Sequence, residues 1–221
     1  MSNFENKFYI IKPAVDTEET GHVYPAVQSA PDYNFNTENS IHRLNHHEFP
    51  DFEPNFTFHL SEGARVCDLM GQATISASGL LISERLKNLL VEFNIAPHKL
   101  FPINIVGNGT SYNYYWLHIV WKEIEDLIDY NQSKFFKKRG PRNLGELKIK
   151  SRDDYWHQKK ELGSRFLIGF EKIKFLRVPN FDVWVMPFRG DIICNEEVAM
   201  LIRQNTDFKG IQISPSTQFE F

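Results

Sequence analysis

The sequence predicts an α+β fold, in which largely antiparallel sheet carries a few short helices. Three observations support this prediction. Phe is abundant, with 19 among 221 residues, and this aromatic content is typical of a strand-rich interior. Several short apolar runs alternate with polar residues, as half-buried strands do. A strand–helix–strand pattern also occurs twice, once in each half of the chain.

Size and composition fit a single domain over residues 1–221, with two possible lobes at 1–106 and 107–221. Hydrophobic residues make up 42% and charged residues 24%, which are ordinary values for proteins that stay in water. No apolar run approaches the ~20 residues of a membrane span, and no basic leader precedes an apolar core. We therefore expect a cytoplasmic protein with no membrane partner. Cys67 and Cys194 lack zinc-ligand spacing and are expected to be reduced thiols in the core.

The chain begins with a predicted strand, FYIIKP at 8–13, which ends at a proline. Residues 14–54 are polar, contain several prolines and show little periodicity, which predicts a long surface loop in the first lobe. NFTFHL at 55–60 alternates as a strand does. The next segment, ARVCDLMG at 64–71, is expected to hold a short turn of helix.

The first copy of the repeated pattern is GLLISERLKNLLVEFNI at 79–95. Residues 80–82 are a short apolar strand, and Ser83 is a helix N-cap. Glu84 then places a carboxylate at the positive end of the helix dipole. The apolar face of this helix consists of Leu86, Leu89, Leu90 and Phe93, at spacings of three, four and seven.

The second copy, DIICNEEVAMLIRQNTDF at 191–208, repeats these features 112 residues later. Residues 192–193 are the strand, Asn195 is the cap and Glu196 repeats the acidic first turn. Its apolar face consists of Val198, Leu201 and Ile202.

Each predicted helix leads through a loop to another apolar stretch, LFPINI at 100–105 and GIQIS at 210–214. The chain is therefore predicted to contain two related strand–helix–strand units. The repeated positions are caps and apolar stripes, which helix formation alone explains, and they include no recurring nucleophile, base or ligand set. The repeat predicts a scaffold.

The middle of the chain contains a predicted hairpin. Asn108-Gly109 is typical of a two-residue turn because both positions need positive φ, and its flanks are rich in β-formers. A glycine pair can also cradle phosphate, but no full phosphate-loop motif is present. Residues 117–128 fit a helix by spacing and a strand by composition, so both alternatives stay open.

The last predicted elements are one helix and two strands. Ser151 and Gly163 bound a helix at 152–162, as N-cap and C-terminal glycine. KIKFLRV at 172–178 and FDVWVMPF at 181–188 then alternate as strands.

Charge is unevenly distributed along the chain. Residues 1–62 contain ten Asp and Glu against three Lys and Arg, whereas residues 134–165 contain eleven Lys and Arg against four Asp and Glu. Such segments can steer a charged partner, and they can equally be a solvated face.

Four segments together give a family resemblance: GLLISERLKNLLVEFNIAPHKLFPI, YYWLHIV, LIDYNQSKFF at 127–136 and DIICNEEVAMLIRQNTDFKGIQI. Their order over residues 65–214 resembles an immunity protein family of bacterial polymorphic toxin systems. The resemblance implies a non-catalytic protein that binds and neutralises a cognate toxin. It implies no catalytic residue and no cofactor.

If the partner is a basic toxin, the acidic N-terminal segment is the natural docking surface, because opposite charge accelerates encounter. The residues hypothesised to bind the partner are Asp16, Glu18, Glu19, Glu38, Glu48, Asp51 and Glu53.

The alternative function is nucleic-acid binding through the basic segment 134–165. The residues that would serve it are Lys137, Lys138, Arg139, Arg142, Lys148, Lys150 and Arg152, with Phe136 and Trp156 to stack on bases. The overall pI of about 6.2 and the lack of a known nucleic-acid module disfavour this alternative.

Histidines provide the remaining candidate chemistry. The most ligand-like group comprises His42, His46, His47, Glu48 and Asp51. A zinc site needs three or four ligands on a rigid element, and this segment reads as a loop, so a surface loop is the preferred interpretation and metal binding the alternative. His98 and His118 lie in apolar contexts and are expected to be core or half-buried residues.

Overall fold

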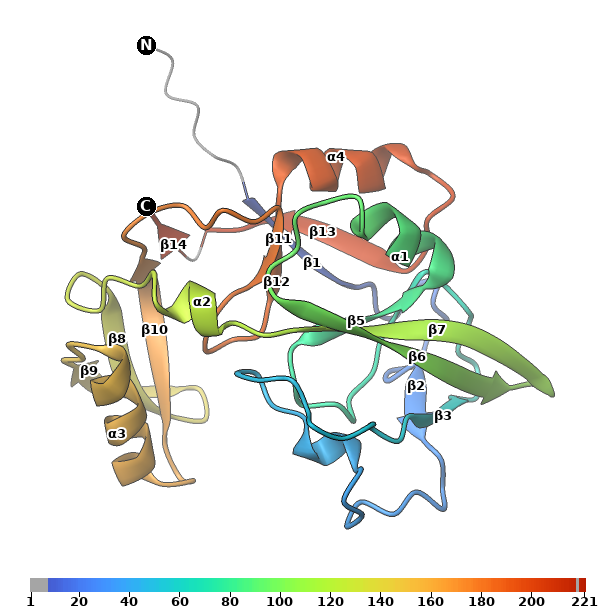
Figure 1. Cartoon of the computed structure of the whole chain (residues 1–221), viewed down its shortest axis with the longest axis horizontal. Helices are drawn as coiled ribbons and strands as arrows, with labels where there is room; N and C mark the ends of the chain where they lie inside the picture. Colours follow the sequence, from blue (N-terminus) through green and yellow to red (C-terminus); the bar gives the residue numbers. More distant parts are fainter. Residues whose placement is uncertain (1–7, 218) are drawn as a thin grey trace. The chain divides into compact units, whose positions relative to one another are not determined.

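The computed structural model describes residues 8–217 and 219–221, which form two compact units (Figure 1). One unit comprises the chain up to Lys122 together with Phe181–Pro215, and the other comprises Glu123–Asn180 and Ser216–Phe221. The fold class is α+β, as predicted. The lobe boundary expected at 106/107 falls inside a strand of the first unit, whose hairpin partner follows directly.

The first unit contains a six-stranded sheet with the strand order β2-β3-β6-β7-β5-β4. Its strands are β2 (Val27–Ser29), β3 (Thr57–Leu60), β4 (Leu69–Met70), β5 (Gly79–Ser83), β6 (His98–Gly107) and β7 (Thr110–Ile119). All neighbours are antiparallel except β3 and β6, which are parallel. Asn108 and Gly109 join β6 to β7 with φ angles of 52° and 74°, so the predicted turn is confirmed.

A second, four-stranded sheet in the same unit has the order β11-β12-β1-β13 and is antiparallel throughout. Its strands are β1 (Phe8–Pro13), β11 (Val183–Val185), β12 (Ile192–Asn195) and β13 (Ile211–Pro215). The N-terminal strand at 8–13 is therefore confirmed, and the strand expected at 181–188 is shorter than predicted.

Both predicted strand–helix–strand segments are present, with the same topology. In the first, β5 and β6 flank α1 (Glu84–Leu90), and β7 lies between the two strands. In the second, β12 and β13 flank α4 (Glu196–Gln204), and β1 lies between them. Each helix packs on the strand before it and on the middle strand. A common origin of the two segments remains a prediction.

The predicted caps begin both helices. Ser83 Oγ accepts a hydrogen bond from Leu86 N at 3.2 Å, and Asn195 Oδ1 accepts one from Val198 N at 3.0 Å. The predicted apolar stripes are correct in part. Leu86, Leu90, Val198 and Ile202 are buried, whereas Leu201 is 38% exposed, and Phe93 lies beyond the end of α1.

The long segment 14–54 is irregular, as expected, but it is not simply a surface loop. It contains β2 and a 3-10 turn, Ile41–Arg43. Tyr33, Ile41 and Leu44 are buried in one hydrophobic cluster with the inward residues of β6 and β7. Apolar side chains at these three positions therefore attach the segment to one face of the six-stranded sheet.

Two other local expectations are corrected or resolved. Segment 64–71 forms no helical turn, because Leu69 and Met70 pair with β5 as strand β4. The ambiguous segment 117–128 divides its residues between the end of β7 at Ile119 and a short helix, α2 (Lys122–Glu125).

The second unit contains most of α2, one longer helix and a sheet in the order β14-β10-β8-β9. Its elements are β8 (Lys134–Arg139), β9 (Arg142–Leu147), α3 (Arg152–Leu162), β10 (Leu167–Lys174) and β14 (Phe219–Glu220). The helix at 152–162 is confirmed: Ser151 Oγ accepts from Asp154 N at 3.1 Å, and Gly163 ends it with a φ of 64°. The strand predicted at 172–178 begins and ends earlier, and the β8–β9 hairpin was not predicted.

Candidate functional site

All seven acidic residues hypothesised to bind a partner are exposed in the structure. They fall into two groups along the chain. Asp16, Glu18 and Glu19 precede β2, and the other four, Glu38, Glu48, Asp51 and Glu53, follow it. Both groups belong to the first unit.

Hydrogen bonds hold two residues of the first acidic group to other segments of the chain. Arg65 Nη1 donates to the carbonyl of Glu18 at 2.6 Å, and Gly210 N donates to Glu19 Oε2 at 3.0 Å. Asp16 pairs with His22 at 2.8 Å, and both side chains are more than two-thirds exposed. Glu19 is therefore used partly for attachment, while Asp16 lies in the solvent.

Two residues of the second acidic group line a shallow hollow of about 500 Å³. These residues are Glu38 and Asp51, and Arg43 lines the same hollow. The guanidinium group of Arg43 donates to the carbonyl of Glu38 and lies 4.7 Å from the centroid of the Phe52 ring. Because Arg43 is bonded to a carbonyl and a ring, the two carboxylates remain available to a cation from outside.

One histidine of this segment, His46, attaches it to residues that adjoin β5 and β7. His46 stacks on Trp121, with ring centroids 4.3 Å apart, and its Nδ1 lies 2.7 Å from Ser78 Oγ. His42 instead contacts the ring of Phe35 at 4.5 Å. The structure therefore separates the two histidines that the sequence spacing paired. Within the described residues, no group of three or more His, Cys, Asp or Glu side chains is arranged to hold a metal ion.

His118 is a fully buried core histidine, as expected. Its Nε2 lies 2.8 Å from the carbonyl oxygen of Asn45, so it too holds the long segment against β7. Burial lowers the pKa of His118, although the bond to Asn45 opposes this. The expectation for His98 was wrong: its side chain is exposed at the beginning of β6.

A second hollow surrounds a buried carboxylate that the sequence analysis did not single out. Asp68 is 6% exposed and accepts hydrogen bonds from Ser83 Oγ at 2.7 Å, Arg85 Nη2 at 2.6 Å and Lys209 N at 2.9 Å. Burial opposes ionisation of Asp68, but these hydrogen bonds outweigh it and lower the pKa. Arg85 and this full set of donors make Asp68 a structural anchor.

The thiols are inert in their surroundings. Burial raises the pKa of Cys67 to about 12 and that of Cys194 to about 12, so both stay protonated and poorly nucleophilic at neutral pH. Both lie in the core, as expected.

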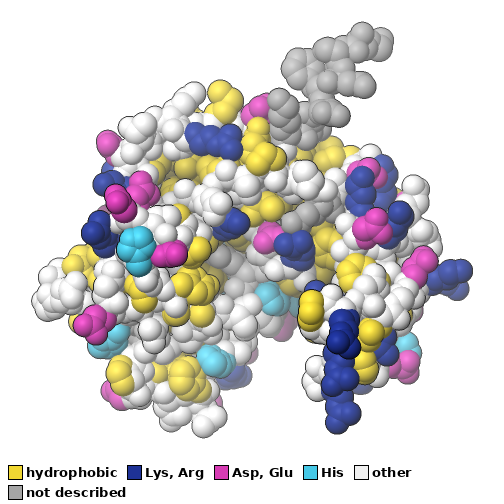
Figure 2. Space-filling view, turned by 180° about the vertical axis from the view of Figure 1, so that it is seen from behind, with side chains coloured by type: hydrophobic (Ala, Val, Ile, Leu, Met, Phe, Trp, Pro, Cys, Tyr) yellow, Lys and Arg dark blue, Asp and Glu magenta, His cyan; other side chains and the backbone are white. Residues whose placement is uncertain are grey.

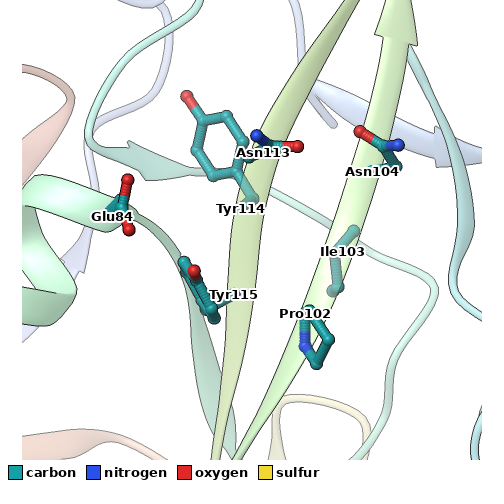
Figure 3. A pocket seen from close by; sticks show the side chains of 7 residues that line it. All are labelled: Glu84, Pro102, Ile103, Asn104, Asn113, Tyr114 and Tyr115. Carbon is teal, nitrogen blue, oxygen red and sulfur yellow. The ribbon is translucent and has the colours of Figure 1, made fainter.

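A third hollow lies on the outward face of the β6–β7 hairpin (Figure 3). Figure 3 shows Pro102 and Asn104 on β6 beside Asn113 and Tyr115 on β7, with Glu84 at the beginning of α1 nearby. Asn104 and Asn113 are direct cross-strand partners. None of the three hollows places a hydroxyl or thiol beside a histidine base among its lining residues.

The basic segment 134–165 folds as the β8–β9 hairpin followed by α3. Two of its candidate residues are already used inside the second unit. Arg152 Nε lies 3.2 Å from the buried Glu125, and Trp156 Nε1 donates to the same carboxylate at 2.7 Å. Neither side chain is therefore a free contact for a nucleic acid. Figure 2 shows Lys and Arg side chains in a column on this unit, flanked by hydrophobic ones.

The model of a family described as Immunity protein family (Imm11) matches residues 7–216. A comparison with curated proteins finds no match. The described part of the chain contains no helix with the length and hydrophobicity that a membrane span requires.

Proposed function

The chain belongs to the immunity protein family Imm11, and from this premise we propose that it binds a cognate protein toxin and neutralises it by contact alone. Its means of action would be occlusion or distortion of the toxin, with no chemical step. The inert thiols and the absence of a nucleophile–base pair in the three hollows support a non-catalytic role.

The observation that carries the choice of surface is the hollow between Glu38 and Asp51. A carboxylate pair in a shallow hollow suits an Arg or Lys side chain of the partner, because charge-assisted hydrogen bonds are the strong ones. We propose that all seven acidic residues named as partner-binding candidates contribute to docking, with Glu38 and Asp51 at the centre of the surface.

The anchoring of segment 14–54 supports this assignment. Tyr33, Ile41 and Leu44 are buried, and Ser40 bridges to Asn55, so the carboxylates lie on a pre-formed surface. A surface that needs no ordering on binding loses less conformational entropy, and more of the interaction energy appears as affinity.

The test measures association of the purified chain with its toxin by surface plasmon resonance at two ionic strengths. Glu38→Lys/Asp51→Lys is expected to lower the association rate about tenfold or more at low salt, with a smaller effect at high salt. The matched control, Glu146→Lys/Glu161→Lys, adds the same charge on exposed residues of the second unit. Equal rates for the parent and the Glu38/Asp51 variant would show that docking occurs elsewhere.

A further inference from the structure

A short stretch of chain, residues 45–49, joins the two parts of the hollow that contains Glu38 and Asp51. Residues 36–38 and 43 line the hollow before this connecting segment, and residues 51 and 52 line it after the segment. Attachment of the connecting segment to the sheet therefore helps to fix Asp51 relative to Glu38.

Three hydrogen bonds attach the connecting segment to β7 and to residues that adjoin β5 and β7. The carbonyl oxygen of Asn45 lies 2.8 Å from His118 Nε2, and the carbonyl oxygen of His46 accepts from Trp121 N at 3.0 Å. His46 Nδ1 lies 2.7 Å from Ser78 Oγ. Of the groups in these bonds, His118 is the one that is both titratable and fully buried.

The hydrogen bond to Asn45 determines where the neutral His118 ring carries its proton. A carbonyl oxygen can only accept, so Nε2 bears the proton and Nδ1 is bare. Nδ1 is buried and has no hydrogen-bond partner among the residues that the structure describes. A second proton would therefore place a donor and a positive charge where nothing accepts them, which is costly while the site stays closed.

Apolar rings and a cation surround His118. The rings of Phe49 and Phe101 have their centroids 5.6 and 6.4 Å from that of His118. Lys99 is its cross-strand partner on β6 and adds a positive charge. Burial lowers the pKa of His118; the bond to Asn45 opposes this shift, and the charge of Lys99 adds to it.

The titratable groups of the connecting segment make other contacts. His46 and His47 pack on the ring of Trp121, with centroids 4.3 and 5.5 Å apart. Glu48 is exposed, and its carboxylate accepts from a side-chain amide of the same segment at 3.3 Å. Within the described part of the chain, no carboxylate therefore forms an ion pair that would stabilise a charged His118.

We propose that His118 is an acid-sensitive latch, whose protonation detaches residues 45–49 from β7 and so disrupts the toxin-docking hollow. The charged ring gains hydration when its cover moves away. Phe49 belongs to this cover, because it contacts the His118 ring and is itself 37% exposed. The opening is local, since Ile41 and Leu44 remain buried in the core and hold the preceding residues in place.

The direction of the pH dependence follows from the two states of the latch. In the open state, His118 takes up a proton near the ordinary histidine pKa of about 6.5, whereas the closed state takes it up only at lower pH. Closing is therefore favoured above about pH 6.5 and is lost progressively as the pH falls below that value. Detachment of the segment is a property of the chain alone, while control of toxin binding by it rests on the proposed function.

Hydrogen exchange of single backbone amides, followed by NMR on the full chain without toxin, tests the latch. Trp121 N donates to the connecting segment, whereas Ile119 N donates to Ser78 O, outside it, at 3.2 Å. Between about pH 7.5 and about pH 5, protection of the Trp121 amide, corrected for the intrinsic exchange rate, should fall about tenfold, and that of Ile119 less than about twofold. Constant protection at Trp121, or an equal loss at Ile119, would overturn the proposal.

Two variants separate His118 from the histidine of the connecting segment. His118→Phe should show weaker protection of the Trp121 amide that no longer depends on pH. His46→Gln is the matched control and should retain the pH dependence; the opposite result for either variant would overturn the proposal. Titration of the His118 ring in the parent protein needs no variant, and a pKa at or above about 6.5 would overturn it as well.

The link to the docking hollow is tested with the toxin at the same two pH values. Titration of the toxin itself affects the parent and His118→Phe equally, so the ratio of their dissociation constants reports the latch. On acidification the parent is expected to lose about fivefold or more in affinity relative to His118→Phe. An unchanged ratio would overturn control of the hollow by His118. Absence of toxin binding at both pH values would refute the proposed function, and the exchange measurement would then decide on the latch by itself.

Discussion

Asp68 and Asp182 make the same hydrogen bonds in two different segments of the first unit. The carbonyl oxygen of Asp68 accepts from Ser83 N at 2.8 Å, and its Oδ1 accepts from Ser83 Oγ at 2.7 Å. The carbonyl oxygen of Asp182 accepts from Asn195 N at 2.9 Å, and its Oδ1 accepts from Asn195 Nδ2 at 2.7 Å. Each aspartate thus orients the residue that caps the following helix.

The second carboxylate oxygen of each aspartate reaches the other segment. Asp68 Oδ2 accepts from Lys209 N, which follows α4, and Asp182 Oδ2 accepts from Asn94 N, which follows α1; both distances are 2.9 Å. The backbone N–H groups of Asp68 and Asp182 donate back to the same two residues, at 2.9 and 2.7 Å. The two segments therefore interlock reciprocally, and a common origin for them remains a prediction.

Replacing either Asp68 or Asp182 is expected to destabilise the first unit. Asp68→Ala and Asp182→Ala should each lower the free energy of unfolding by about 1.5–3 kcal/mol, because several donors lose a charged acceptor. Denaturant unfolding monitored by circular dichroism measures this. Glu62→Ala changes an exposed loop residue and is the control, with an expected effect within about 0.5 kcal/mol. A loss of stability in only one of the two variants would contradict the equivalent roles of Asp68 and Asp182.

Gly210 is expected to tolerate no side chain. Its φ is +75°, and a Cβ would lie 2.3 Å from Cys67 Sγ, so Gly210→Ala adds a steric clash to backbone strain. Gly63 is a matched control, because its φ is +82° and a Cβ there would meet no atom within 4 Å. Gly63→Ala should cost about 1–2 kcal/mol from strain alone. Gly210→Ala should cost clearly more in the same unfolding measurement, and equal losses would contradict the packing around Cys67.

Acid is expected to weaken the attachment of the long segment through His118. Its pKa in the folded protein is lower than in the unfolded chain, so the unfolded chain binds more protons between the two values. Its contribution to stability is therefore present above about pH 6.5 and is lost as the pH falls below that value. Urea unfolding between neutral and mildly acidic pH measures the effect.

The control variants for His118 separate this residue from the other histidines. His118→Phe should lower stability at neutral pH, since Asn45 loses its donor, but it should remove much of the acid-dependent loss. His59→Gln changes an exposed histidine of β3 and should retain the dependence. An unchanged pH profile for His118→Phe would assign the loss to other groups.

In the second unit, removing Arg152 should destabilise the fold more than neutralising its buried partner, Glu125. Glu125 has no exposed side-chain surface; its burial raises its pKa, although Trp156 and Arg152 oppose this. Arg152→Ala leaves the carboxylate without its ion pair to Arg152 and should cost about 3–5 kcal/mol. Glu125→Gln should cost less, because an amide oxygen can still accept from Trp156.

The Glu125 carboxyl group also determines how the stability of the Arg152→Ala variant should depend on pH. A carboxyl group whose folded pKa is raised binds a proton more readily in the folded state, so the variant should gain stability as the pH falls through the Glu125 pKa. Hydrogen exchange over Glu123–Asn180 reports this locally. Equal protection in Arg152→Ala and the parent protein would contradict a structural role for the pair.

The sequence predicted what local patterns determine. Ser83 and Asn195 were identified as caps, and Asn108-Gly109 as a turn, because each motif carries its own geometry within a few residues. The sequence could not show that Asp68 bonds Lys209 across 141 positions, since such a contact has no local signal. The burial of Tyr33, Ile41 and Leu44 was hidden for a similar reason: isolated apolar residues in a polar segment show no period.

For the candidate sites too, the sequence showed local features but not long-range contacts. The acidic and basic segments were visible in the composition, and all seven acidic residues are exposed. What the composition could not separate were paired and unpaired charges. Arg152 counts as a basic residue in the sequence but is bonded to Glu125 and Asp126 in the fold, whereas Arg139 and Arg142 are placed opposite each other by the strand register.

We propose that this protein neutralises a toxin by stoichiometric contact. The most direct measurement titrates a fixed amount of the active cognate toxin with the purified protein and follows the toxin's own activity. We predict a linear loss of activity that ends at a fixed molar ratio and is unchanged by longer incubation. Inactivation of many toxin molecules by one molecule of this protein, or full toxin activity at saturating concentrations, would contradict it.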